Sequence, residues 1–109
     1  MTQPIGDPIS NPPAVKTLVV RTISELRATI AGWRQDGNSV ALVPTMGYLH
    51  DGHLELVRRG RFLCRRTVAT VFVNPTQFGP TEDIDRYPRD ETGDLAKLTR
   101  IGCDLLFAP

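Results

Sequence analysis

The chain has 109 residues, enough for one domain with a modest hydrophobic core. With 40% hydrophobic and 23% charged residues it has the composition of a soluble globular protein, and its formal net charge of +1 argues against attraction to nucleic acid or membranes. No apolar run approaches the roughly 18 residues of a membrane-spanning helix, we see no signal-peptide pattern, and Cys64 and Cys103 form no CxxC pair. We therefore expect a cytoplasmic protein with two reduced thiols.

Residues 1–15 contain four prolines and few large apolar side chains, which predicts a disordered or extended tail. The apolar residues 18–20 predict a first strand. Thr22 lies three residues before Glu25 in a capping-box pattern, and apolar residues at helical spacing follow, so we expect a helix that ends at Gly37. The apolar positions of this helix are Ile23, Leu26, Ile30 and Trp33.

A second strand is expected over residues 40–43, where Pro44 stops it, and residues 45–52 are expected to form a loop. Residues 53–65 then predict a second helix. Gly60 lies in its middle, at a cost of about 1 kcal/mol relative to alanine. The inward positions of this helix are Leu54, Val57 and Leu63.

Residues 68–73 are apolar on both faces, which predicts a buried parallel strand. A long loop over 74–88 follows, then a helix over 90–101 with Gly102 after its end, and a fourth strand over 104–108. Strands that alternate with helices predict an α/β fold, a Rossmann-like parallel sheet of about four strands with flanking helices. The third helix is expected to bury Leu95 and Leu98.

The chain stops at Pro109, directly after an apolar strand that no helix follows. A doubly wound sheet has helices on both faces, so we expect residues 16–109 to be the N-terminal portion of a larger, truncated domain. A complete four-stranded domain is the alternative.

Residues 44–53, PTMGYLHDGH, follow a strand and open a helix. A helix N-terminus attracts anions because its first N–H groups lack intrahelical partners and its dipole adds partial positive charge. Gly47 and Gly52 let the backbone approach a ligand, and His50 and His53 share a face of the first helical turn. Two imidazoles there suit the charge that develops on phosphorus and on a departing pyrophosphate.

Two other interpretations of the histidine pair are a metal site and surface residues without a role. A metal site needs a third ligand, and the nearest candidate, Asp51, points to another face, so we predict no metal ligands. The HxGH motif is short, but its place between a strand and a helix favours phosphate chemistry.

A second polar segment, residues 72–79, follows the third strand and emerges at the same edge of the sheet, where ligands of open α/β sheets bind. The amides of Asn74 and Gln77 donate and accept hydrogen bonds, which suits a small acid bearing hydroxyl and carboxylate oxygens. A turn built on Asn74 and Pro75, with Gln77 in solvent, is the alternative.

Together these segments resemble the pantoate–β-alanine ligases, a family of the nucleotidylyltransferase (HxGH) type. The similarity extends over nearly everything from residue 17 onward. Other nucleotidylyltransferases share the HxGH motif but not the NPxQF and RYPR segments. The matching segments are VALVPTMGYLHDGHL at 40–54, VFVNPTQFG at 71–79, EDIDRYPRD at 82–90 and DLLFAP at 104–109.

The resemblance implies a two-step reaction with ATP, normally accompanied by Mg2+. The carboxylate of pantoate attacks the α-phosphorus of ATP and pyrophosphate leaves; the amine of β-alanine then displaces AMP from the acyl adenylate. By position, His53 is the general acid, His50 is its partner on the phosphates, Gln77 contacts pantoate and β-alanine, and Asn74 lies beside it. The implied ATP-binding residues are Met46, Gly47, Tyr48, Leu49, His50, Asp51, Gly52 and His53.

The resemblance also implies a cytosolic homodimer. Family members continue well beyond the position of Pro109 with further phosphate-binding and lid segments, so we expect the isolated chain to be inactive. A non-catalytic nucleotide-binding fragment or subunit is one alternative, and another HxGH adenylyltransferase is a second.

Five arginines lie on and after the second helix, and a nucleic-acid surface is one interpretation of them. The nearly neutral chain has no interleaved aromatics here beyond Phe62, which favours a solvated helix face. We therefore expect no nucleic-acid and no membrane partner. The arginines are Arg58, Arg59, Arg61, Arg65 and Arg66.

Overall fold

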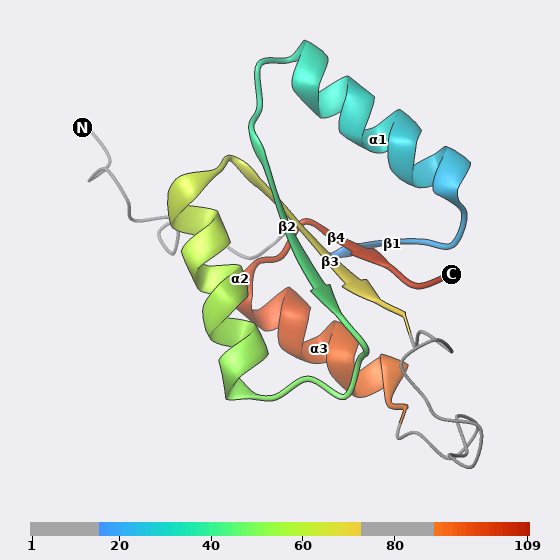
Figure 1. Ribbon diagram of the computed structural model, residues 1–109, viewed down its shortest axis with the longest axis vertical. Coiled ribbons are helices and arrows are strands. Elements are labelled where there is room, and N and C mark those ends of the chain that lie inside the picture. The colour runs from blue at the N-terminus through green and yellow to red at the C-terminus, as the bar shows by residue number, and fades with distance from the viewer. Residues whose placement is uncertain (1–15, 73–88) are drawn as a thin grey trace, which may run out of the picture.

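The computed structural model describes residues 16–72 and 89–109, which form one sheet with helices packed on it (Figure 1). Strands and helices alternate along the chain, which confirms the expected α/β class. Within these ranges the strands are β1 (Leu18–Val20), β2 (Val40–Thr45), β3 (Arg66–Val71) and β4 (Leu105–Phe107), and the helices are α1 (Ile23–Gln35), α2 (Asp51–Leu63) and α3 (Glu91–Ile101).

The strands lie in the order β1-β4-β3-β2, and every neighbouring pair is parallel. The longest pairing joins β2 to β3, from Val40 opposite Arg66 to Thr45 opposite Val71. Because all strands run the same way, their carboxyl ends meet at one edge of the sheet. The loop that begins after Thr45 therefore starts at the edge where α/β proteins bind ligands.

One face of the sheet carries α2 and α3, and the other carries α1 (Figure 1). The larger core, under α2 and α3, includes the buried Val43, Val57, Leu98 and Leu106. The smaller one, under α1, has Val20, Val68 and Leu105 at its centre, with Leu26, Ile30 and Trp33 packed against them. The inward positions Leu95 and Leu98 of α3 are confirmed, since Leu98 is buried and Leu95 packs on the larger core.

The expected end of the second strand at Pro44 is wrong, because β2 continues through Pro44 to Thr45. Pro44 is exposed on an edge strand, where its missing N–H removes little from the ladder. α2 begins at Asp51 rather than His53, because His50 is the N-cap. β3 lies over 66–71 instead of 68–73, since its pairing with β2 starts at Arg66.

Leu63, which was expected to point inward, is 79% exposed. Leu63 lies six positions after the buried Val57, which places it away from the sheet on a helix of 3.6 residues per turn. The inward place is taken instead by Gly60, where an added Cβ would lie 3.0 Å from Ala41 Cβ and 3.1 Å from Thr67 Cγ2. The unfavourable glycine thus permits close packing of α2 on the sheet.

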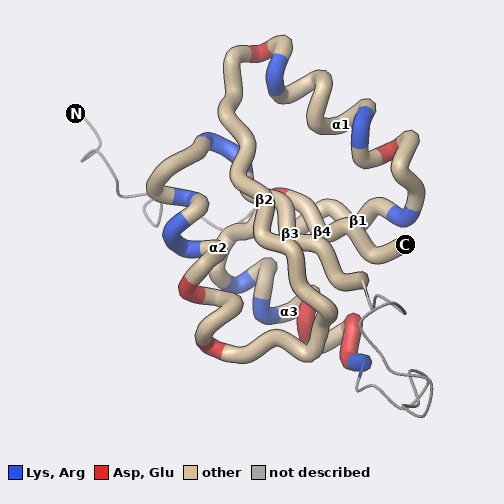
Figure 2. Tube along the Cα trace, in the orientation of Figure 1, with Lys and Arg blue, Asp and Glu red and all other residues tan. Residues whose placement is uncertain are grey.

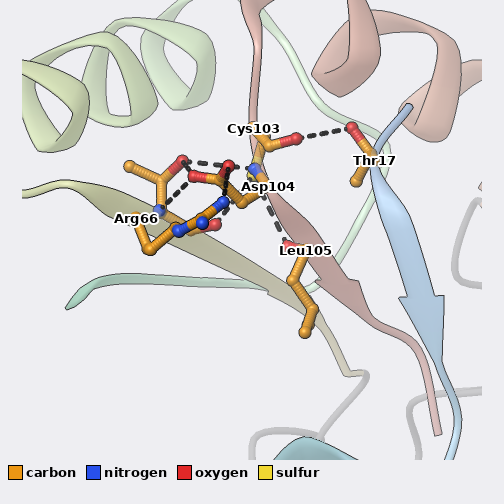
Figure 3. Close-up of polar contacts among 6 residues, drawn as sticks. Thr17, Arg66, Cys103, Asp104 and Leu105 are labelled. Carbon is orange, nitrogen blue, oxygen red and sulfur yellow. Dashed lines mark hydrogen bonds and ion pairs between the residues drawn. The ribbon is translucent and has the colours of Figure 1, made fainter. Parts of the chain in front are cut away.

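At the amino edge of the sheet, Asp104 joins β3 to β4 (Figure 3). Its Oδ2 accepts the backbone N–H of Thr67 at 2.8 Å, and its Oδ1 lies 3.4 Å from the Arg66 guanidinium. Thr17 donates to the Cys103 carbonyl at 2.7 Å. Cys103 is buried and Cys64 half-buried, and neither forms a disulfide, as expected.

The arginines on and after α2 do not form one solvated face, although Figure 2 shows several basic residues along this helix. Arg61 donates to the Ile101 carbonyl at 2.8 Å, and Arg66 lies 5.1 Å from the Trp33 ring centroid. Arg58 pairs with Glu55 on the surface. Arg61 and Arg66 therefore have structural roles that the sequence pattern did not indicate. In the part of the chain that the structure describes, no helix is long and apolar enough to cross a membrane.

Candidate nucleotide-binding site

The HxGH segment connects the end of β2 to the start of α2. Gly47 and Tyr48 have positive φ angles of 87° and 54°, so the chain turns sharply there. His50 is the N-cap of α2 in extended conformation, and His53 is the third residue of the helix. The predicted location of both histidines at the start of the second helix is confirmed.

The imidazoles of His50 and His53 lie against each other, with ring centroids 4.1 Å apart and planes tilted by 35°. Nδ1 of His50 accepts the backbone N–H of Gly52 at 3.0 Å, and Nδ1 of His53 accepts the N–H of His50 at 3.2 Å. A ring that accepts at Nδ1 is neutral and carries its proton on Nε2. Both rings therefore carry their donor N–H on Nε2.

The environment of His53 favours this neutral form. Burial lowers the pKa of His53 below its ordinary value of 6.5, and the neighbouring His50 lowers it further, whereas the Asp94 carboxylate opposes both effects. The ring is thus a hydrogen-bond donor at neutral pH without being a cation.

Asp94 and Lys97 of α3 bond the backbone of the turn, and neither residue was predicted from the sequence. The Asp94 carboxylate is buried and accepts the backbone N–H groups of Tyr48 at 2.8 Å and Leu49 at 2.7 Å. Lys97 Nζ donates to the Leu49 carbonyl at 2.9 Å. The available signal was an acidic residue in the apolar stripe of a helix, since Asp94 shares its face with Leu98 and Ile101.

The residues predicted to bind ATP divide into two groups. Tyr48, Asp51 and Gly52 are exposed, and His53 is half-buried at the start of α2. Leu49 is only 3% exposed, and its N–H and carbonyl are both bonded to α3, so it supports the turn from inside the core.

A cavity of about 400 Å³ lies beside the turn, at the carboxyl ends of β2, β3 and β4. Its volume falls in the range of small-molecule sites. Arg21 bonds both carboxylate oxygens of Glu91 at 2.6 and 2.7 Å, and this contact lowers the pKa of Glu91. The wall at the start of α3 is thus charged. The cavity is lined by Met46, Gly47, Val71, Phe72, Arg89, Asp90, Glu91, Asp94, Ala108 and Pro109.

The other predicted site residues, Asn74 and Gln77, lie outside the described residues. Across 16–72 and 89–109, no group of three or more His, Cys, Asp or Glu side chains could hold a metal ion.

A parallel α/β sheet with an HxGH junction between a strand and a helix defines a fold of the nucleotidylyltransferase type. The family model for pantoate-beta-alanine ligase matches residues 18–109. The chain therefore belongs to the pantoate–β-alanine ligase family.

Individual relatives agree with this assignment. The chain is 63% identical over 91 residues to a pantothenate synthetase of Paramagnetospirillum magneticum, covering 84% of this chain and 32% of the relative. A crystal structure of pantothenate synthetase from Thermus thermophilus superimposes with a TM-score of 0.77 and 54% identity over 85% of this chain and 32% of that one.

A more distant structure, the Francisella tularensis pantoate-beta-alanine ligase complexed with beta-gamma ATP and beta-alanine, is 30% identical with a TM-score of 0.76, covering 85% of this chain and 35% of that one. The chain thus spans about a third of the length of the relatives that it matches.

Proposed function

We propose that this chain is the ATP-binding part of a ligase that joins pantoate to β-alanine. In the first step the pantoate carboxylate attacks the α-phosphorus of ATP, forming an acyl–phosphate bond as the bond to pyrophosphate breaks. In the second step the β-alanine amine attacks the acyl carbon, the bond to AMP breaks, and the amine loses a proton. The reaction takes place in the cytoplasm, in a homodimer.

The observation that carries the proposal is the histidine pair at the start of α2, in which each Nδ1 accepts a backbone N–H and Nε2 is left for a ligand. His50 and His53 donate to phosphate oxygens, and donors already in place stabilise the charge that grows there in the transition state. The N-terminus of α2 adds a partial positive charge beside the two rings. In this neutral form His53 donates its Nε2–H to the departing pyrophosphate as a hydrogen bond and keeps the proton, whereas the general-acid role that the resemblance implies requires the doubly protonated ring.

ATP enters as its Mg2+ complex, because Mg2+ commonly binds through nucleotide phosphates and water instead of a protein cage. The acid substrate is assigned to the cavity beside Met46, whose volume of about 400 Å³ is in the range of small-molecule sites and where the carboxyl ends of three strands meet. Gln77 and Asn74 contact it in this proposal.

The test uses a chimera in which residues 16–109 replace the matching third of the Thermus thermophilus enzyme. We expect AMP release that requires both pantoate and β-alanine, and its loss in His53→Ala. The 109-residue chain alone is expected to show no turnover, because it spans only about a third of the length of the relatives that it matches. A folded chimera that binds ATP but forms no adenylate would contradict the ligase and support a non-catalytic nucleotide-binding protein.

The acid-binding assignment has its own test. Gln77→Ala in the chimera should raise the KM for pantoate at least about tenfold and leave ATP binding nearly unchanged, because an amide that bonds only the acid contributes nothing to the nucleotide. Equal losses for both substrates would show that residue 77 acts on the whole site.

A further inference from the structure

We propose that Asp94 and Lys97 are positioning residues, which orient the histidine pair by holding the backbone of the turn before it. The inference rests on the proposed function, because it concerns how that site is kept in order. Neither side chain is assigned a substrate contact in it.

The geometry of the turn supplies the first argument. Gly47 and Tyr48 are successive residues with positive φ, and such a turn points neighbouring N–H groups into one concavity that binds anions. The anion here belongs to the protein, since the two Asp94 oxygens accept the N–H groups of residues 48 and 49. These two amides are therefore not available to a phosphate.

The conformation of Tyr48 supplies the second argument. A bulky residue at a φ of 54° is strained, typically by about 1–3 kcal/mol, and such a conformation persists only where the surroundings determine it. The surroundings are α3: Asp94 is 2% exposed and bonds both amides, while Lys97, one turn later, bonds the next carbonyl. A carboxylate and an ammonium group on one face of α3 thus bond the backbone N–H and the carbonyl of Leu49, respectively.

The turn leads directly into the histidines. The N–H of His50, the residue after Leu49, is the group that bonds Nδ1 of His53. A shift of the turn would move this N–H, release Nδ1, and let the ring rotate or exchange tautomers. Asp94 therefore acts on His53 through the backbone, over a path of consecutive residues.

Asp104 provides a control, because it is a half-buried carboxylate that likewise accepts a backbone N–H, from Thr67 at 2.8 Å, but at the opposite edge of the sheet. Asp94→Asn and Asp104→Asn should both destabilise the fold. In the chimera described above, only Asp94→Asn should lower kcat, by about 10–100-fold with little change in the KM for ATP, because misplaced groups lose transition-state contacts. Lys97→Met should act in the same direction more weakly.

The second readout is histidine tautomer state, measured by 15N NMR on the 109-residue chain. Wild type and Asp104→Asn should show His53 protonated on Nε2 alone, and Asp94→Asn should show a mixture. The NMR measurement tests the positioning role even if the chimera is inactive. An inactive chimera would count against the proposed ligase activity only. The positioning role would be overturned by equal kcat losses in the two aspartate variants, or by an unchanged His53 tautomer in Asp94→Asn. If Asp94→Asn does not fold, the same two measurements are made on Lys97→Met.

Discussion

The backbone N–H of His50 bonds Nδ1 of His53 at 3.2 Å, so each ring in this pair is oriented by main chain rather than by another side chain. The arrangement separates two functions of one imidazole. Nδ1 belongs to the fold of the helix N-terminus, and Nε2 is left for a ligand. Substitutions can therefore remove one function and keep the other.

His53→Asn is expected to keep the fold and lose the chemistry. The asparagine oxygen reaches about as far as Nδ1 and still accepts the His50 N–H, but nothing replaces the Nε2–H donor. Adenylate formation in the chimera should fall by about 10²–10³, the usual effect of removing one donor to a developing charge. Thermal unfolding of the variant should match wild type, and an equally large loss of stability would show that the ring acts mainly by packing.

Stability should depend on pH through His53. Its pKa is lowered in the folded chain, so between that value and 6.5 the unfolded chain binds more protons. The contribution of His53 is then fully present above pH 6.5 and is lost as the pH falls through the folded pKa. Urea unfolding from about pH 5 to 8 checks this, with His53→Asn as the control that should show a smaller slope; a slope of opposite sign would mean that the Asp94 carboxylate dominates.

Gly60→Ala and Gly32→Ala should have opposite effects on stability. Both glycines lie in helices, where alanine gains up to about 1 kcal/mol. At Gly32 nothing lies within 4 Å of an added Cβ, so the gain is expected in full. At Gly60 the new methyl meets Ala41 and Thr67 of the sheet, and overpacking of about 1–3 kcal/mol outweighs the gain. Unfolding midpoints of the two variants measure the difference, and stabilisation by both would refute the close helix–sheet contact.

Gly47→Ala should weaken ATP binding, whereas Gly37→Ala should not. Both glycines have positive φ, 87° and 82°, so both variants lose stability, by about 1–2 kcal/mol for the left-handed conformation. Only the alanine at position 47 approaches the site, with its Cβ 3.3 Å from Asp94 Oδ2 and 3.7 Å from Val71 Cβ. ATP titration of the chimera by calorimetry distinguishes the two, and equal affinities would show that the turn tolerates displacement.

The alternation of strands and helices could be predicted from local signals alone, because hydrophobic periodicity, the Thr22–Glu25 capping box and the helix end at Gly102 need no distant partner. The location of the histidine pair followed in the same way, since three residues of spacing on a helix bring two side chains together whatever the rest of the chain does. The inward assignment of Leu63 was wrong, because its six-residue spacing from Val57 does not match the helical period.

How the histidines are held, and where the turn is supported, depends on contacts between segments far apart in the chain. Asp94 is 45 residues from Leu49, and its role arises because α3 packs beside α2 on one face of the sheet. A buried charge is stable only with hydrogen-bond or ionic partners near it in space, and the spacing of residues in the sequence does not identify those partners. The same holds for Gly60, whose effect on stability depends on the side chains of two strands that lie beneath it.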